Sequence, residues 1–190
     1  MIDPQQRARE HLRPDEHLYW AGTSDPGKLF TGRDAFLVPF SLVWCGFAVV
    51  WTVTAASSGA PPFFLVFGGV FTLVGLYFVA GRFLVKRYRK QHTVYAVTDR
   101  RALVISPRGT REVPVGRSDR TVTWTADRRH CSVEWEVGEP SAKAMFFGAG
   151  AQTKYYANSG LDGVIGPQTM AFWDVTDGEE LVRELERAAR

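Results

Sequence analysis

The clearest pattern in the chain is one long uncharged stretch, because no Asp, Glu, Lys, Arg or His occurs from Ala35 to Gly81. A hydrocarbon core of roughly 30 Å takes about 20 helical residues per crossing, so the stretch is long enough for two crossings. It is divided at residues 57–62 by Ser-Ser-Gly-Ala-Pro-Pro, a composition that ends helices. The pattern predicts a transmembrane helical hairpin over residues 35–84, with helices at 36–56 and 63–83. The alternative, a buried core, would need a larger soluble interior than 190 residues provide.

Basic residues flank the hairpin on one side only. Lys28 and Arg33 precede the first helix, five Lys or Arg residues follow the second between residues 82 and 90, and the loop at 57–62 has none. Lys and Arg are enriched in the cytoplasmic flanks of membrane helices. We therefore expect a multi-pass protein with both termini in the cytoplasm, and residues 1–34 form a cytoplasmic N-terminal segment in this prediction.

Small residues recur on one face of each predicted helix, at spacings of three and four. Lipid provides no hydrophobic drive between helices, so small side chains that let backbones approach are expected at the helix contact. The alternative for the same faces is the contact surface of a homo-oligomer. The expected packing positions are Ser41, Cys45, Ala48 and Thr52 in the first helix and Gly68, Thr72 and Gly75 in the second.

The basic segment after the second helix predicts contact with an anionic membrane surface. Lys86, Arg87, Arg89 and Lys90 would face lipid phosphates if the helix continued beyond the bilayer. The alternative is that these residues only fix the topology. The net charge of the whole chain is a modest +3, and its positive excess lies in this segment, so no nucleic-acid partner is expected.

From Thr93 the hydrophobic period changes to two, which is typical of half-buried antiparallel strands. The closing segment instead repeats apolar residues at helical spacing after Thr176 and Glu179, which fit a capping box. Tyr19 and Trp20 could form an edge strand of the same sheet or lie at the membrane interface. The predicted fold of residues 93–190 is a bent antiparallel sheet or barrel capped by a C-terminal helix, in an α+β membrane protein. Its seven or so strands are expected near 94–97, 102–105, 112–115, 121–125, 131–137, 143–147 and 170–175.

Three motifs resemble those of a known family. They are Glu-x-x-Tyr-Trp-x-Gly at 16–22, Thr-x-Tyr-Ala-Val-Thr-Asp-Arg-Arg at 93–101, and Phe-x-Asp-Val-x-Asp at 172–177. The chain is similar in these motifs to bacterial inner-membrane proteins with two transmembrane helices and a pleckstrin-homology-like (PH-like) domain. The resemblance implies a PH-like fold and a place in the cell inner membrane. It does not imply inositol-lipid binding, because Asp99 and Arg100 make a tight turn where eukaryotic pleckstrin-homology domains have a long basic loop.

Candidate catalytic chemistry is sparse, so the chain is not expected to be an enzyme. The glycine-rich segment at 148–154 lacks the Gly-Lys-Ser/Thr of a phosphate loop, and the adjacent His130 and Cys131 would point to opposite faces of a strand. We expect no catalytic residue, no cofactor and no metal. The remaining function is a non-catalytic binding or scaffolding module, with the bilayer and an unidentified protein as partners.

The long loop at 148–166 carries Tyr155 and Tyr156, which are expected to contact that protein partner. Two alternatives stay open at this point: a component of a membrane transport or assembly complex, and a specific anionic-lipid receptor. A carrier commonly places an ionisable residue within a membrane helix, and neither predicted helix contains one, which favours the anchored module.

Overall fold

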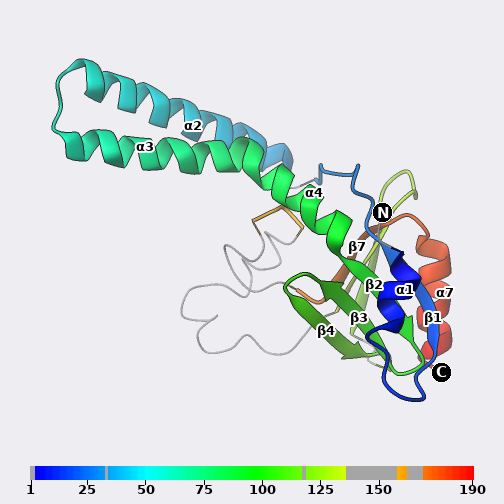
Figure 1. Cartoon of the computed structure of the whole chain (residues 1–190). Helices are drawn as coiled ribbons and strands as arrows, with labels where there is room; N and C mark the ends of the chain where they lie inside the picture. Colours follow the sequence, from blue (N-terminus) through cyan, green and yellow to red (C-terminus); the bar gives the residue numbers. More distant parts are fainter. Residues whose placement is uncertain (1–2, 33, 117–118, 136–157, 162–168) are drawn as a thin grey trace.

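The computed structural model describes residues 3–32, 34–116, 119–135, 158–161 and 169–190. Within these residues the chain forms two parts (Figure 1). A pair of antiparallel helices projects from one end of a domain made of two β-sheets, and helix α4 (Arg82–His92) connects the two parts.

The helix pair consists of α2 (Asp34–Ser57) and α3 (Pro62–Leu76). Between them Gly59 adopts φ +67°, which glycine reaches at no steric cost, and the Ala60 N–H donates to the Ala55 carbonyl at 3.1 Å to close α2. Helix α3 continues through a π-helical turn, η1 (Tyr77–Gly81), into α4. The two continuous helices, 34–57 and 62–92, are long and apolar enough to cross a membrane.

The two helices meet through small residues. Ser41 and Ala48 are buried, and a methyl group added at Gly75 would lie 3.0 Å from the Cys45 Cα atom. One added at Gly68 would collide with the Thr52 hydroxyl. The hydroxyl oxygens of Thr52 and Thr72 lie 3.4 Å apart across the contact. Five of the expected packing positions, Cys45, Thr52, Gly68, Thr72 and Gly75, thus lie where α2 and α3 approach each other, and Ser41 and Ala48 are buried.

Among the described residues, seven strands form two antiparallel sheets. Because the register of each pair alternates inward and outward residues, each sheet presents one continuous apolar face to the other. The first sheet contains β1 (Leu18–Thr23), β2 (Val94–Thr98), β3 (Arg101–Ser106) and β4 (Gly109–Pro114), in that order, and the second contains β5 (Arg120–Trp124), β6 (Cys131–Trp135) and β7 (Ala171–Val175).

The N-terminal segment belongs to the first sheet. Trp20 in β1 pairs with Val97 in β2, and the Trp20 side chain is buried in the core. Of the two alternatives for Tyr19 and Trp20, the edge strand is therefore right and the membrane interface is wrong. The described residues contain the expected antiparallel strands and C-terminal helix, but the strands form two sheets rather than a closed barrel. An isolated bridge between Ser24 and Val175 joins the end of β1 to β7. The strand expected at 143–147 lies outside the described residues.

The core lies between the two sheets and is centred on Phe172, whose ring stacks on Tyr95 at 4.7 Å and meets Trp135 edge-on at 4.9 Å. Helix α7 (Gly178–Ala188) adds Leu181 and Leu185 to this core. Its N-cap is Asp177 and makes no side-chain cap bond, so the capping box expected at Thr176 is wrong. Helix α1 (Pro4–Arg9) covers the other face of the first sheet.

Candidate functional site

Helix α4 connects the helix pair to the sheets through three cations that share one face. Arg82, Lys86 and Lys90 follow each other at intervals of four residues, which stacks them along one side of a helix. Their exposed fractions are only 1%, 3% and 5%. Long cationic side chains are almost never buried unless they are paired, so the partners of this face define how the two parts of the molecule are joined.

Arg82 binds at the beginning of α2. Its Nη1 atom lies 2.6 Å from the Asp34 carboxylate, and both side chains are buried. The other Asp34 oxygen accepts hydrogen bonds from the backbone N–H of Thr31 at 2.6 Å and from its hydroxyl at 2.8 Å. The Arg82 Nε–H donates to the Phe78 carbonyl at 2.8 Å, within the π-helical turn. This ion pair fixes the start of α4 to the start of α2.

Lys90 binds the end of the second sheet. Its ammonium lies 2.6 Å from one oxygen of Asp174 in β7, while Lys28 lies 2.6 Å from the other oxygen. The Asn158 amide also donates to Asp174, at 2.7 Å. Lys90 further donates to the Lys28 carbonyl at 2.7 Å, and Lys86 donates to the Leu29 carbonyl at 2.6 Å. We call Asp34, Arg82, Lys86, Lys90 and Asp174 the α4 junction.

Burial and charge pairing act against each other at two residues of the α4 junction, Asp174 and Lys90. Burial raises the pKa of the Asp174 carboxyl, but the nearby ammonium groups and the hydrogen bonds that it accepts outweigh burial and hold this pKa at about 2. Burial lowers the pKa of the Lys90 ammonium, and the nearby Asp174 carboxylate offsets part of this decrease. Asp174 also has a positive φ of 49°, so the strand bends where its carboxylate meets α4.

This arrangement corrects the expected lipid contacts for two of four residues. Lys86 and Lys90 do not face outward, because both ammonium groups donate to carbonyl or carboxylate oxygens of the protein. Arg87 is exposed, and Arg89 is half-buried at the wall of a cavity. Tyr155 and Tyr156, which are expected to contact a protein partner, lie outside the described residues.

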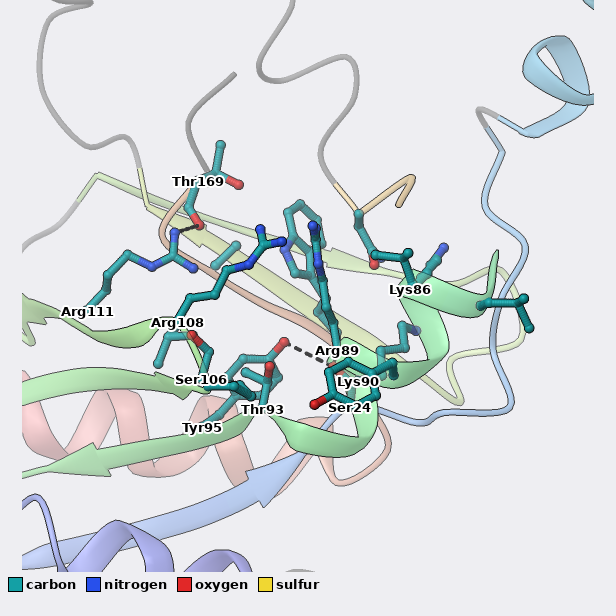
Figure 2. Close-up of a pocket in the computed structure, with 18 residues that line it drawn as sticks. Ser24, Lys86, Arg89, Lys90, Thr93, Tyr95, Ser106, Arg108, Arg111 and Thr169 are labelled. Atoms are coloured by element: carbon teal, nitrogen blue, oxygen red, sulfur yellow. Dashed lines mark hydrogen bonds between the residues drawn. The ribbon is translucent and has the colours of Figure 1, made fainter. Parts of the chain in front are cut away.

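A cavity of about 490 Å³ lies between α4 and the open end of the two sheets. Its floor continues the core through Tyr95, Val104 and Ala171, which are buried. Figure 2 shows Arg108 and Arg111 from the strand side and Arg89 from α4 extending toward the same part of this space. We call it the α4 cavity.

One cation of the α4 cavity lies on the inner face of a strand. Arg111 is two residues from the buried Val113 in β4, so both side chains point to the core side of the sheet. Its Nη1 atom donates to the Thr169 carbonyl at 3.3 Å. Arg111 occupies an inward position of β4, and Ser106 lies near it on the inner face of the neighbouring strand β3. A charged residue at an inward strand position is the signal by which the sequence could have indicated this cavity.

The acidic and basic residues of the first two motifs form a separate network at the opposite end of the first sheet. Arg101 donates to both oxygens of Glu16 at 2.8 Å, and the Thr98 hydroxyl donates to Glu16 at 2.8 Å. Arg101 also pairs with Glu112. The Arg101 hydrogen bond lowers the pKa of Glu16 to about 2, against the effect of burial. These motif residues hold β1 to the β2–β3 turn.

Within the described residues no group of three His, Cys, Asp or Glu side chains is placed to hold a metal ion. His130 lies 2.8 Å from Asp25, and this hydrogen bond lowers the pKa of the Asp25 carboxyl. Burial raises the pKa of the Cys131 thiol to about 11, which keeps it protonated near neutral pH. Cys131 is thus a core residue rather than a reactive thiol.

Comparisons with known protein families, with curated proteins and with solved structures found no match for this chain.

Proposed function

We propose that this protein is a non-catalytic binding or scaffolding module anchored in the cell inner membrane. In this proposal α2 and α3 cross the bilayer, and the two-sheet domain, a PH-like arrangement of bent sheets with a C-terminal helix, lies at the cytoplasmic face. The α4 junction holds the domain at a fixed height and orientation on the bilayer. A fixed pose is what a scaffold needs in order to present one surface to its partners.

The observation that carries membrane insertion is the exposed apolar surface of the helix pair. Large hydrophobic side chains are exposed all along both helices, far beyond the few hundred Å² that a soluble monomer ordinarily leaves uncovered. Examples from the ends and the middle of the pair are Phe36, Phe47, Val50, Val53, Phe63, Val66, Val70 and Leu73.

Orientation follows from the charges on the two ends of the helix pair. Every Lys and Arg near the helices lies on the side of the sheet domain, and the turn around Gly59 has none. The positive-inside bias then puts both termini in the cytoplasm. The buried ion pair of Arg82 with Asp34 is consistent with helices that cross the bilayer. The pair lies at the end of the apolar stretch rather than in its middle, where ionisable residues are costly.

The absence of candidate chemistry among the described residues supports a binding role over a catalytic one. The buried charged groups are used in structural ion pairs: Asp34 with Arg82, and Asp174 with Lys28 and Lys90. A catalytic acid or base needs a group that can change its protonation state near neutral pH. The Asp174 carboxyl, with a pKa of about 2, is far from that range.

Alkaline carbonate extraction of membranes from cells that express the full chain tests the proposal. Val50→Lys with Val70→Lys places two charges on outward positions of α2 and α3, each of which costs about 3 kcal/mol at the centre of a membrane helix. We expect the wild type to stay in the membrane pellet and this variant to be lost from it.

The matched control is Thr121→Lys with Thr123→Lys, which adds the same charge at exposed positions of β5. This control should remain in the pellet. Extraction of the wild-type chain into the soluble fraction, or equal retention of both double variants, would refute membrane anchoring.

A further inference from the structure

Helix α4 buries three of its cations and exposes apolar side chains. Arg82, Lys86 and Lys90 are buried against oxygen atoms of the protein. With a rotation of about 100° per residue, Leu84 and Tyr88 lie on the other side of the helix, and they are 70% and 56% exposed. A helix on the surface of a soluble domain shows the reverse arrangement, with its apolar stripe toward the core and its charges in water. The outer side of α4 is therefore suited to surroundings less polar than water.

A second exposed apolar side chain lies at the same level of the molecule, in the segment before α2. The Phe30 side chain is 67% exposed, and its ring centroid lies 5.1 Å from that of Phe83 near the start of α4. On the neighbouring first turn of α2, Phe36 is 61% exposed. Exposed apolar side chains therefore continue beyond the helix pair toward the sheet domain, where α4 connects the two parts (Figure 1). We call Phe30, Leu84 and Tyr88 the collar.

The position of the collar along the second helix matches the depth of lipid headgroups. Helix α3 and η1 have 15 and 5 residues, which together span about 30 Å and so the hydrocarbon core of a bilayer. Leu84 and Tyr88 lie about 4.5 Å and about 10.5 Å beyond the end of η1. Helical side chains tilt toward the N-terminal end, which in α4 is the end at the helix pair, so both side chains reach back toward the bilayer. The headgroup layer on each side is about 5–7 Å thick, and the collar lies at its level.

We propose that the collar is an interaction surface for the headgroup layer of the cytoplasmic leaflet, so that the first two turns of α4 lie in the membrane interface rather than form a spacer in the cytoplasm. This inference rests on the proposed membrane anchoring and adds to it the level at which the sheet domain meets the bilayer. A Tyr side chain suits this depth, because its ring is apolar and its hydroxyl can bond to water or headgroups. The exposed Arg87 can keep its aliphatic stem beside the collar and its guanidinium group near the phosphates.

The continuity of the exposed surface favours the bilayer over a second protein as the occupant of the collar. Every fourth residue along the second helix from Leu76 to Tyr88 is exposed, and none of these residues is charged: Leu76, Ala80, Leu84 and Tyr88. This line begins on α3, which faces acyl chains in the proposed function, and runs into α4 without a polar interruption. Lipid that covers the first part of the line therefore also meets the collar.

The test is the immersion depth of nitroxide spin labels on the full-length chain, in nanodiscs of phosphatidylcholine with a minor share of phosphatidylglycerol. Depth follows from the collision rates of each label with oxygen, which concentrates among acyl chains, and with a water-soluble nickel chelate. Single cysteines are introduced into the Cys45→Ala protein, and that protein without an added cysteine gives the background of the buried Cys131. The labelled variants are Phe30→Cys and Leu84→Cys in the collar, with Val70→Cys, Gln91→Cys and Arg100→Cys as controls.

The controls define the two limits of depth and a matched position on α4. Val70 is exposed on α3 and should give a label deep in the hydrocarbon core, and Arg100 is exposed in the β2–β3 turn and should give a label in water. Gln91 is exposed on the same side of α4 as Leu84, but about 10.5 Å farther along the helix. We expect the Phe30 and Leu84 labels within the headgroup layer and the Gln91 label outside it, about 10 Å farther from the hydrocarbon core than the Leu84 label.

Two results would overturn the inference while the Val70 label stays in the hydrocarbon core. One is a Leu84 or Phe30 label as accessible to the nickel chelate as the Arg100 label, because the collar would then lie in water or await another occupant. The other is equal depth of the Leu84 and Gln91 labels, because depth would not follow the axis of α4. A Val70 label that is itself accessible to the chelate would instead refute membrane anchoring, so failure of the proposed function is distinguishable from failure of the collar.

Discussion

Replacing Lys90 by methionine removes the cation that joins α4 to the second sheet and keeps most of the side-chain volume. In the wild type the Lys90 ammonium lies 2.6 Å from Asp174, and their side chains are 5% and 4% exposed. The substitution leaves the carbonyl of Lys28 without its Lys90 donor and leaves Asp174 with the hydrogen bonds of Lys28 and Asn158. The variant therefore tests whether the α4 junction stabilises the molecule.

The expected magnitude follows from burial. Removing one partner of a buried ion pair costs about 3–5 kcal/mol. Because Lys28 still neutralises Asp174, the lower end applies, and we expect the free energy of unfolding of the sheet domain to fall by about 3 kcal/mol. With a urea dependence of about 2 kcal/mol per molar, the midpoint should move down by about 1.5 M.

The assay is urea unfolding of the full chain in detergent micelles, followed by near-ultraviolet circular dichroism of the aromatic core. The matched control is Arg87→Met, which removes an exposed cation from the same helix and should change the free energy of unfolding by less than about 0.5 kcal/mol. Hydrogen exchange gives a second readout, because amides of α4 and β7 should exchange faster in Lys90→Met only. Equal midpoints for the two variants, or a midpoint for Lys90→Met above that of the wild type, would refute the reasoning.

Two further predictions concern the helix contact and the response to acid. Gly75→Cys should form a disulfide with the native Cys45 under mild oxidation. A Cβ atom at Gly75 would lie 3.0 Å from that of Cys45, so a small separation of the helices brings the two Cβ atoms to the roughly 3.5–4.5 Å of a disulfide. Leu73→Cys, at a 68% exposed position, should not form it, and equal yields of the two disulfides in non-reducing mass spectrometry would contradict the contact. Glu16 and Asp174 have pKa values of about 2 in the folded chain against ordinary values of 4.5 and 3.8, so the stability that they contribute is complete above about pH 4.5 and is lost as the pH falls toward 2. The lowered pKa of Glu16 corresponds to roughly 3 kcal/mol of folding stability. Between pH 5 and pH 2 the urea midpoint should therefore fall more steeply for the wild type than for Glu16→Gln. Parallel curves for the two proteins would contradict a stabilising role of the Glu16 carboxylate.

The helix pair could be predicted from the sequence because its signal is local. An uncharged stretch with a Gly-Ala-Pro-Pro break predicts two apolar helices and a short turn without any knowledge of distant residues. Three helix boundaries agree with the prediction to within two residues. Helix α2 is Asp34–Ser57 where 36–56 was predicted, and α3 begins at Pro62 where 63 was predicted. The period of two likewise predicts β5 and β6, whereas β2 and β3 are buried along nearly their whole length because α1 covers their other face.

The α4 junction could not be predicted, because its partners are far apart in the chain. Lys90 and Asp174 are separated by 84 positions, so a basic segment beside a membrane helix was interpreted as a lipid contact. Two signals in the sequence indicate the α4 junction instead. One is the spacing of four between Arg82, Lys86 and Lys90, and the other is the single acid, Asp174, inside the apolar strand β7. Division into two sheets also depends on long-range pairing, as between Ser24 and Val175, which alternation within one strand does not reveal.

Labelling with a membrane-impermeant maleimide in intact spheroplasts tests the central proposal most directly. Ser58→Cys is exposed in the turn between α2 and α3, and Asp127→Cys is exposed in the β5–β6 turn; the wild type, whose Cys131 is buried, gives the background. Anchoring with both termini in the cytoplasm predicts that Ser58→Cys is labelled before lysis and Asp127→Cys only after lysis. Labelling of Asp127→Cys before lysis, or protection of both cysteines until lysis, would contradict a hairpin that crosses the membrane from the cytoplasmic side.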